Sequence, residues 1–271
     1  MTQAPLAVPA AVFAPQAPAG PAHAPVSDPE APAGPAHALV FAPVTPRWDG
    51  GAFFTPVTRV LAGAGLRVTV VDTLAAWDEE TDSLDSFAAR WRTLLPRFGP
   101  VDLLCGNALG GALAQALLPD LAPGTAALLV SGPARSDALL EARLTEIADL
   151  AAGGRSDAAL ALLNRRVQPR GHRTDPAGDG PAPHDPSAGR RLAAGLRMLR
   201  GIDVSDAVRA HPGPLLQIVG SHSQLVTQRH TAAAPHHRVA VIEGAGMRPH
   251  FERTAEVSAL VGSFLRQKGL T

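Results

Sequence analysis

The residues with the clearest chemical meaning lie in a short turn near the middle of the chain. An apolar run, residues 103–105, enters the turn Gly106-Asn107-Ala108-Leu109-Gly110-Gly111, and an apolar segment that favours helix follows. This pattern predicts a strand, a sharp turn and a helix. A serine at the centre of such a turn can act as a nucleophile. The centre here is Ala108, which has neither a proton to lose nor a lone pair, so the glycine turn (residues 106–111) lacks its hydroxyl.

Four other residues could carry chemistry, and each has a structural interpretation beside the functional one. His250 and His222 are candidate general bases that could activate water directly, or they are packed or solvent-exposed histidines. Cys105 is a candidate nucleophile, but we expect it to point into the sheet as a small apolar residue. Asn107 flanks the centre of the turn and could present its amide to a bound carbonyl group.

Histidine and aspartate residues also gather in a segment rich in proline and glycine. Their spacing matches no metal-ligand motif, and the composition favours a solvated loop. We therefore predict no metal site and no cofactor. The residues concerned are His172, Asp175, Asp179, His184 and Asp185.

The overall composition limits the partners and the compartment. The 271 residues are 46% hydrophobic, which is enough for one large domain with a substantial core. Basic and acidic residues number 24 each, so there is no global field to attract nucleic acid or a membrane surface. The single cysteine fits a protein of a reducing compartment. The sequence contains no apolar run of about 18 residues that could span a bilayer. We expect a cytoplasmic location.

The first 37 residues are dominated by alanine and proline and contain an internal repeat. The sequence Ala-Pro-Ala-Gly-Pro-Ala-His-Ala occurs at residues 17–24 and again at residues 31–38. Such a tract favours polyproline II conformations and cannot bury a core. We predict a disordered leader over residues 1–37, and we keep open the possibility that it docks on a protein partner.

From residue 38 to residue 271, apolar strand patterns alternate with helical ones. This alternation predicts an α/β protein with a doubly wound, mostly parallel sheet. Between residues 134 and 202 the strand signal disappears, so we expect this segment to be an inserted helical cap. The predicted strands are residues 38–42, 66–72, 103–107, 125–132, 214–220 and 237–242, and the predicted helices are residues 52–62, 87–95, 109–118, 138–151, 157–167, 190–199 and 255–267.

The order of these landmarks resembles the α/β-hydrolase superfamily, in particular its capped members similar to esterases and epoxide hydrolases. The first strand with its loop, the glycine turn, the cap and the strand ending at Gly220 come in the family's order. The segment Gly244-Ala245-Gly246-Met247, followed by Glu252-Arg253, looks like the family's Gly-x-Gly-His segment before the last helix.

The resemblance implies a Ser-Asp-His triad at three positions, and all three hold other residues. The nucleophile position is Ala108, the acid position is Ser223 and the histidine position is Met247. The resemblance also implies two backbone N–H donors for an oxyanion, at Leu109 and at Val44, since Pro43 has no N–H. The predicted binding pocket is formed by Val44, Asn107, Ala108, Leu109, Ser223, Met247 and His250.

Three functions remain open on this basis. The first is a protein with a degenerate triad that binds a small apolar molecule, or assists a cyclisation or lyase step, without hydrolysis. The second is a pseudoenzyme that acts through protein contacts, with the leader as a tether. The third is an esterase-type hydrolase that uses displaced residues such as His250 or His222.

Overall fold

A seven-stranded sheet organises the part of the chain that the computed structural model describes, residues 7–15, 34–172 and 186–270. The strands follow the order β1-β3-β2-β4-β5-β6-β7, and all pairs are parallel except β1 with β3. The predicted α/β class and mostly parallel sheet are therefore confirmed. The strands are β1 (Ala10–Phe13), β2 (His37–Phe41), β3 (Arg67–Val71), β4 (Leu103–Asn107), β5 (Ala126–Val130), β6 (Leu215–Gly220) and β7 (Arg238–Ile242).

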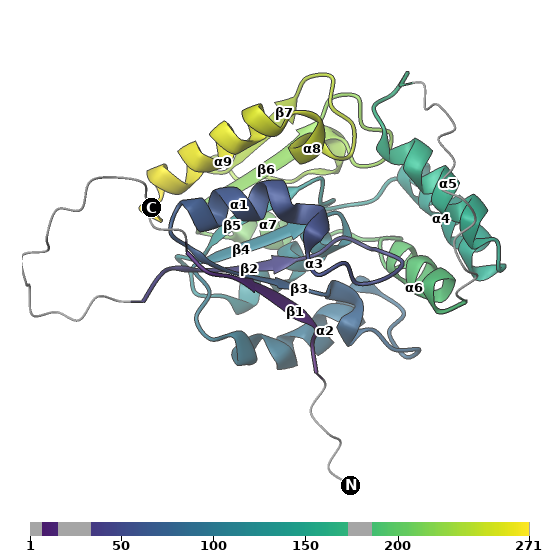
Figure 1. Ribbon diagram of the computed structural model, residues 1–271, viewed down its shortest axis with the longest axis horizontal. Helices are drawn as coiled ribbons and strands as arrows, with labels where there is room; N and C mark the ends of the chain where they lie inside the picture. Colours follow the sequence, from purple (N-terminus) through teal and green to yellow (C-terminus); the bar gives the residue numbers. More distant parts are fainter. Residues whose placement is uncertain (1–6, 16–33, 173–185, 271) are drawn as a thin grey trace, which may run out of the picture.

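Helices cover both faces of the sheet (Figure 1). Successive side chains of each strand point to opposite faces and pack against the helices there. On one face, Ala38 and Val40 of β2 belong to a cluster with α1 (Thr55–Gly63) and α9 (Thr254–Gln267). On the other face, Leu39 and Phe41 belong to a cluster with α2 (Leu84–Leu94) and α3 (Leu109–Leu117). This arrangement buries β2 and β4 on both sides, which explains their continuous apolar runs.

Three helices between β5 and β6 lie together at one end of the sheet (Figure 1). They are α4 (Ala138–Ala152), α5 (Ser156–Val167) and α6 (Pro186–Arg197), and α4 contacts both of the others. A further short helix, α7 (Ser205–Ala210), contacts α3 instead. We call α4, α5 and α6 the cap helices.

The predicted disordered leader contains a strand, which corrects the prediction for part of residues 1–37. Strand β1 pairs with β3 in antiparallel fashion, from Ala10 opposite Val71 to Phe13 opposite Val68. The backbone C=O of Pro9 also accepts a hydrogen bond from the N–H of Asp72. A strand of four residues is enough here because the edge of β3 away from β2 is otherwise unpaired. Residues 1–6 and 16–33, with the first copy of the repeat, lie outside the described residues.

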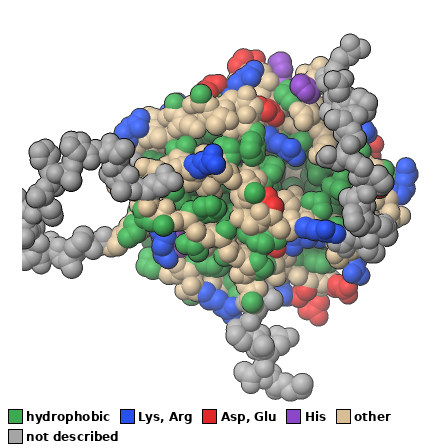
Figure 2. Space-filling model, in the orientation of Figure 1, with side chains coloured by type: hydrophobic (Ala, Val, Ile, Leu, Met, Phe, Trp, Pro, Cys, Tyr) green, Lys and Arg blue, Asp and Glu red, His purple; other side chains and the backbone are tan. Residues whose placement is uncertain are grey.

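Within the described ranges, none of the helices combines the length and the apolar composition that crossing a bilayer requires. Acidic and basic side chains are interspersed on the face shown in Figure 2, and neither sign dominates it.

Candidate functional site

Ala108 occupies a strained position between β4 and α3. Its backbone angles are φ 50° and ψ −115°, and a positive φ is uncommon for a residue other than glycine. Its N–H donates to the C=O of Val130 at 3.2 Å, which ties the turn to β5. The predicted strand, sharp turn and helix are therefore confirmed, and the turn keeps its sharp geometry with alanine at its centre.

The glycines of the glycine turn are required by close backbone contacts. A Cβ atom on Gly106 would lie 2.3 Å from the carbonyl oxygen of Gly110, and one on Gly110 would lie 2.2 Å from that of Phe41. A Cβ on Gly111 would lie 2.7 Å from the Cα of Gly132. Real Cβ atoms do not approach backbone so closely, so the glycines hold β2, β4, α3 and the end of β5 together.

A cavity of about 80 Å³ lies between the glycine turn and the cap helices. Ala108 forms part of its wall, together with residues of the loop after β2, of all three cap helices and of the loops that follow β6 and β7. The wall is apolar except for two side chains, Asn107 and Arg248. The other lining residues are Pro43, Val44, Phe53, Leu109, Leu140, Leu144, Leu163, Val167, Leu196, Leu199, Leu225, Val226 and Met247.

Ser223 and Met247 are in direct contact, although they belong to different loops. The Ser223 hydroxyl points at the Met247 sulfur over 3.7 Å, and it accepts a hydrogen bond from the N–H of Leu225 at 3.3 Å. Both side chains are buried. Met247 lines the cavity beside Ala108, whereas Ser223 stands behind it. The positions that the sequence marks for an acid and a histidine are therefore neighbours.

Hydrogen bonds fasten the cap to the strand ends around the cavity. The N–H of Met247 donates to the C=O of Val167 at the end of α5, and that of Arg170 donates to the C=O of His222. On the opposite side, Arg191 of α6 forms an ion pair with the buried carboxylate of Asp72, and its Nε donates to the C=O of Thr45 at 2.9 Å.

Five of the seven residues predicted to form the pocket line this cavity. They are Val44, Asn107, Ala108, Leu109 and Met247. Leu109 is the first residue of α3, so its N–H lies in the first turn of the helix, where no partner exists within the helix. The Asn107 side-chain NH₂ donates to the C=O of Val130 at 2.8 Å, so this amide helps to hold the turn.

His250 does not line the cavity, because the one-turn helix α8 (Pro249–Glu252) carries its ring to the other side of Phe53. The side chain is 0% exposed, and the rings of Phe54 and Phe251 pack against it at centroid distances of 5.2 and 4.8 Å. Neither ring nitrogen has a hydrogen-bond partner. Burial lowers the pKa of His250 to about 4, so the ring is neutral at pH 7.

His222 and Cys105 also lie away from the cavity wall. The His222 side chain is 51% exposed, and its Nε2 lies 3.8 Å from the carboxylate of Glu243. Cys105 is fully buried in the core cluster under α1 and α9, as expected, and burial raises the pKa of its thiol. The geometry therefore brings neither residue to Ala108.

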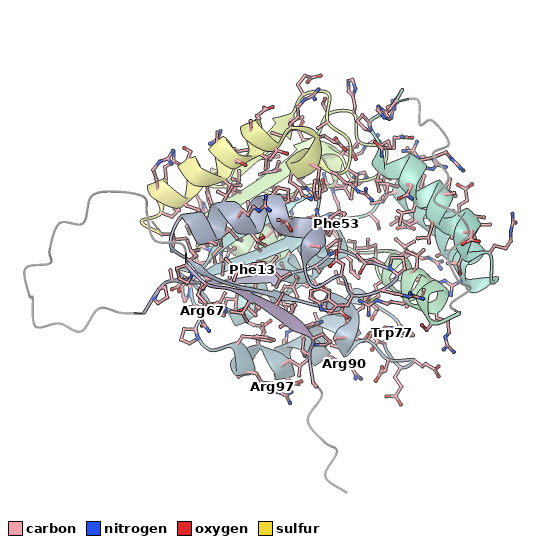
Figure 3. The ribbon with its side chains drawn as sticks, viewed as in Figure 1. Phe13, Phe53, Arg67, Trp77, Arg90 and Arg97 are labelled. Atoms are coloured by element: carbon pink, nitrogen blue, oxygen red, sulfur yellow. The ribbon has the colours of Figure 1, made fainter. Side chains whose placement is uncertain are left out.

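Arg248, the residue after Met247, also lines the cavity, although it was not predicted from the sequence to do so. Its guanidinium lies over the Phe53 ring, with Cζ 5.2 Å from the ring centroid, and both residues line the cavity. Figure 3 shows Phe53 at the end of α1 that faces the cap. The Arg248 Nε atom is buried without a hydrogen-bond partner, and burial lowers the pKa of this group although Glu252 opposes the shift. An arginine in a loop gives no sequence signal of such burial.

Of the histidine and aspartate residues in the segment rich in proline and glycine, only His172 lies within the described residues. Among the residues that the structure does describe, no group of His, Cys, Asp and Glu side chains is arranged to hold a metal ion.

No model of a known protein family and no curated protein sequence matches the chain. Solved structures do match it. An alpha/beta hydrolase enzyme from a Medee basin deep-sea metagenome library shares 11% identity over 95% of this chain and 93% of its own, with a TM-score of 0.71. The enol-lactonase from Burkholderia xenovorans LB400 shares 12% identity over 96% of each chain, with a TM-score of 0.67.

A third similar structure is the thermophilic esterase from Thermogutta terrifontis, with 17% identity over 96% of this chain and 93% of its own and a TM-score of 0.65. The similarity extends over nearly the whole of each chain. Together with the sheet order and the glycine turn, these matches establish that the chain has the α/β-hydrolase fold.

Proposed function

We propose that this protein binds a small, largely apolar molecule in the cavity under its cap and does not hydrolyse esters by a serine mechanism. The observation that carries the proposal is the cavity itself, whose wall contains Ala108 at the point where a nucleophile would stand. Burial of hydrocarbon there contributes about 25 cal/mol per Å² of apolar surface. A non-hydrolytic step such as a cyclisation or a lyase reaction would use the same shape.

The chemistry of the three marked positions supports this proposal. Serine-type hydrolysis needs a nucleophile, a base and a carboxylate that orients the base. Ala108 offers no nucleophile, and the Ser223 hydroxyl contacts the Met247 thioether where a carboxylate would meet an imidazole. A thioether is only a weak hydrogen-bond acceptor and takes up no proton at neutral pH. The strained turn is retained although its usual reactive group is absent.

Displaced histidines give less support to a hydrolytic function. Water activation would require an imidazole within hydrogen-bond reach of a substrate in the cavity. His250 lies behind Phe53 with its ring in an aromatic cluster, and His222 lies on the surface beside Glu243. The solved structures with this fold include enzymes named as an esterase and an enol-lactonase, so a hydrolytic ancestry of the cavity is part of the proposal.

Ester hydrolysis tests the catalytic half of the proposal. The wild-type protein is compared with Ala108→Ser, with the triple variant Ala108→Ser, Ser223→Asp, Met247→His, and with Ala108→Gly as a control without a hydroxyl. With p-nitrophenyl butyrate we expect background rates for the wild type and Ala108→Gly, and measurable turnover for the triple variant. Wild-type turnover well above background that is lost in His250→Ala or His222→Ala would overturn the proposal.

Ligand binding tests the other half. Hexan-1-ol should raise the melting temperature of the wild type, because it binds only the folded protein. Leu163→Phe, which adds volume to the cavity wall from α5, should abolish that shift, and Leu260→Phe on the sheet side of α9 should not. A shift that persists in Leu163→Phe would place the alcohol elsewhere and contradict the proposal.

A further inference from the structure

We propose that the ligand of the cavity ends in a carboxylate and that Arg248 binds this group. The inference rests on the proposed binding function and adds the chemical class of the ligand, a small apolar carboxylic acid. It goes beyond that function because the three positions discussed above carry no charge, whereas Arg248 brings a cation to the same wall.

The first observation is the Nε atom of Arg248, which is buried without a hydrogen-bond partner. The side chain as a whole is partly buried. The nearby carboxylate of Glu252 is engaged elsewhere, since its oxygens accept hydrogen bonds from the backbone N–H groups of Gly246 and Arg248. A partly buried cation whose Nε lacks a hydrogen-bond partner is unfavourable, and an anionic ligand that accepts from it would lower that cost.

The second observation is how Arg248 is held. Its guanidinium rests on the face of Phe53, and Phe53 forms the adjacent part of the cavity wall. A guanidinium over an aromatic face is held there by the electrostatic attraction of the ring, and its N–H groups can still donate in the guanidinium plane. Two parallel N–H groups on that edge match the two oxygens of a carboxylate.

The third observation is the polarity of the remaining wall. Asn107 is the other polar side chain there, and its NH₂ group already donates to Val130. The cap contributes leucines, among them Leu140, Leu144 and Leu196. A ligand therefore finds one charged group and an apolar surface, which suits a molecule with one anionic end and a hydrocarbon body.

The charge distribution on the cap side of the cavity also favours an anion. Burial lowers the pKa of Arg143, and the nearby Arg166, Arg170 and Arg229 lower it further, while Asp137 opposes that shift. Arg143 donates to the C=O of Gln224, the residue before Leu225 of the cavity wall. Part of this positive charge is balanced by Glu146, which pairs with Arg166 at 2.9 Å.

The test measures dissociation constants for three compounds of equal chain length, hexanoate, hexan-1-ol and hexylamine, by NMR titration at pH 7. For the wild type we expect hexanoate to bind at least about tenfold more tightly than hexan-1-ol, because hydrogen bonds to charged groups are stronger than neutral ones. Hexylamine should bind more weakly than either.

Arg248→Met replaces arginine by an unbranched side chain, which keeps the apolar stem and removes the charged guanidinium. It should lose the preference for hexanoate while its affinity for hexan-1-ol changes less than about twofold, and the retained alcohol binding shows that the cavity is intact. Arg248→Lys should keep part of the preference. The matched control is Arg253→Met, an exposed arginine outside the cavity, which should behave like the wild type.

The outcomes separate the two proposals. Equal binding of hexanoate and hexan-1-ol by the wild type would overturn the carboxylate inference and leave the proposed binding function in place. A preference for hexanoate that survives in Arg248→Met would also overturn it. Binding of none of the three compounds would overturn the proposed function and the inference with it.

Discussion

The Ser223 hydroxyl lies 3.7 Å from the Met247 sulfur, so the loops after β6 and β7 meet at these two side chains. Because of this contact, a carboxylate introduced at residue 223 should change the pKa of an imidazole introduced at residue 247. The imidazole introduced by Met247→His should have a higher pKa when Ser223→Asp is also present, by about one unit or more, since a nearby carboxylate stabilises the charged ring. Titration of the ring protons by NMR measures this difference.

A control places the carboxylate on the same loop but outside the core. Ser221 is exposed, and its hydroxyl accepts a hydrogen bond from the N–H of Gly244. Ser221→Asp should raise the pKa of the introduced imidazole less than Ser223→Asp does. Equal effects of the two substitutions would show that the side chains at 223 and 247 are not in contact.

The glycine turn should tolerate no side chain at Gly110. Gly110→Ala places a Cβ atom against the Phe41 carbonyl oxygen and should lower the free energy of unfolding by about 2 kcal/mol or more. Gly63→Ala, at the end of α1 where no atom lies within 4 Å of the new Cβ, should be neutral or stabilising. Urea unfolding of both variants checks this, and equal losses would contradict it.

The ion pair between Arg191 and Asp72 should hold the cap closed. Arg191→Met leaves the buried Asp72 carboxylate without its cation, and we expect a loss of about 3 kcal/mol with faster amide hydrogen exchange in α6. In the same helix, Arg197 pairs with Asp149 on the surface, so Arg197→Met should cost less than about 1 kcal/mol. Unchanged exchange in Arg191→Met would show that other contacts fasten the cap.

His250 should make the fold sensitive to acid. Its pKa is about 4 in the folded protein and about 6.5 in an unfolded chain, so the unfolded chain binds more protons between these values. Stability should therefore fall as the pH drops from about 6.5 to about 4, and this histidine contributes about 3 kcal/mol to the fall.

Other histidines with lowered pKa values contribute as well, so the test is a difference between variants. The loss of unfolding free energy between pH 7 and pH 4.5 should be smaller in His250→Phe than in the wild type. If His250→Phe kept the full acid sensitivity, the burial of the ring would not be its cause.

Arg248 should lower the stability of the protein without ligand, although it favours ligand binding. Arg248→Met replaces a partly buried cation, whose Nε lacks a partner, by an apolar side chain of similar length. We expect the free energy of unfolding without ligand to stay the same or to rise by about 1 kcal/mol. Thermal unfolding measures this change, and a large destabilisation would mean that the guanidinium has a structural partner.

The sequence predicts those parts of the fold that local patterns determine. The strands expected at residues 38–42 and 125–132 are β2 and β5, because buried parallel strands need continuous apolar runs. The start of α2 lies three residues before the predicted one, at a capping box of Ser83 and Ser86, and Asp85 in the first turn also stabilises the positive end of the helix dipole.

Contacts between distant segments account for what the sequence does not reveal. The partner of Asp72 is Arg191, 119 residues away, and neither residue has a local motif. His250 follows Met247 by three residues, but Pro249 begins a one-turn helix, which turns the ring away from the cavity. The burial of Arg248 depends on Phe53, which precedes α1 nearly two hundred positions earlier.

Strand β1 forms one of the two edges of the sheet. A long unpaired strand edge is a template on which other chains can assemble into aggregates. At this edge, β1 has four residues and lies between Pro9 and Pro15, whose nitrogens cannot donate a hydrogen bond to an incoming strand. The alanine- and proline-rich segment thus supplies a terminal strand that protects β3 and gives another polypeptide little to extend.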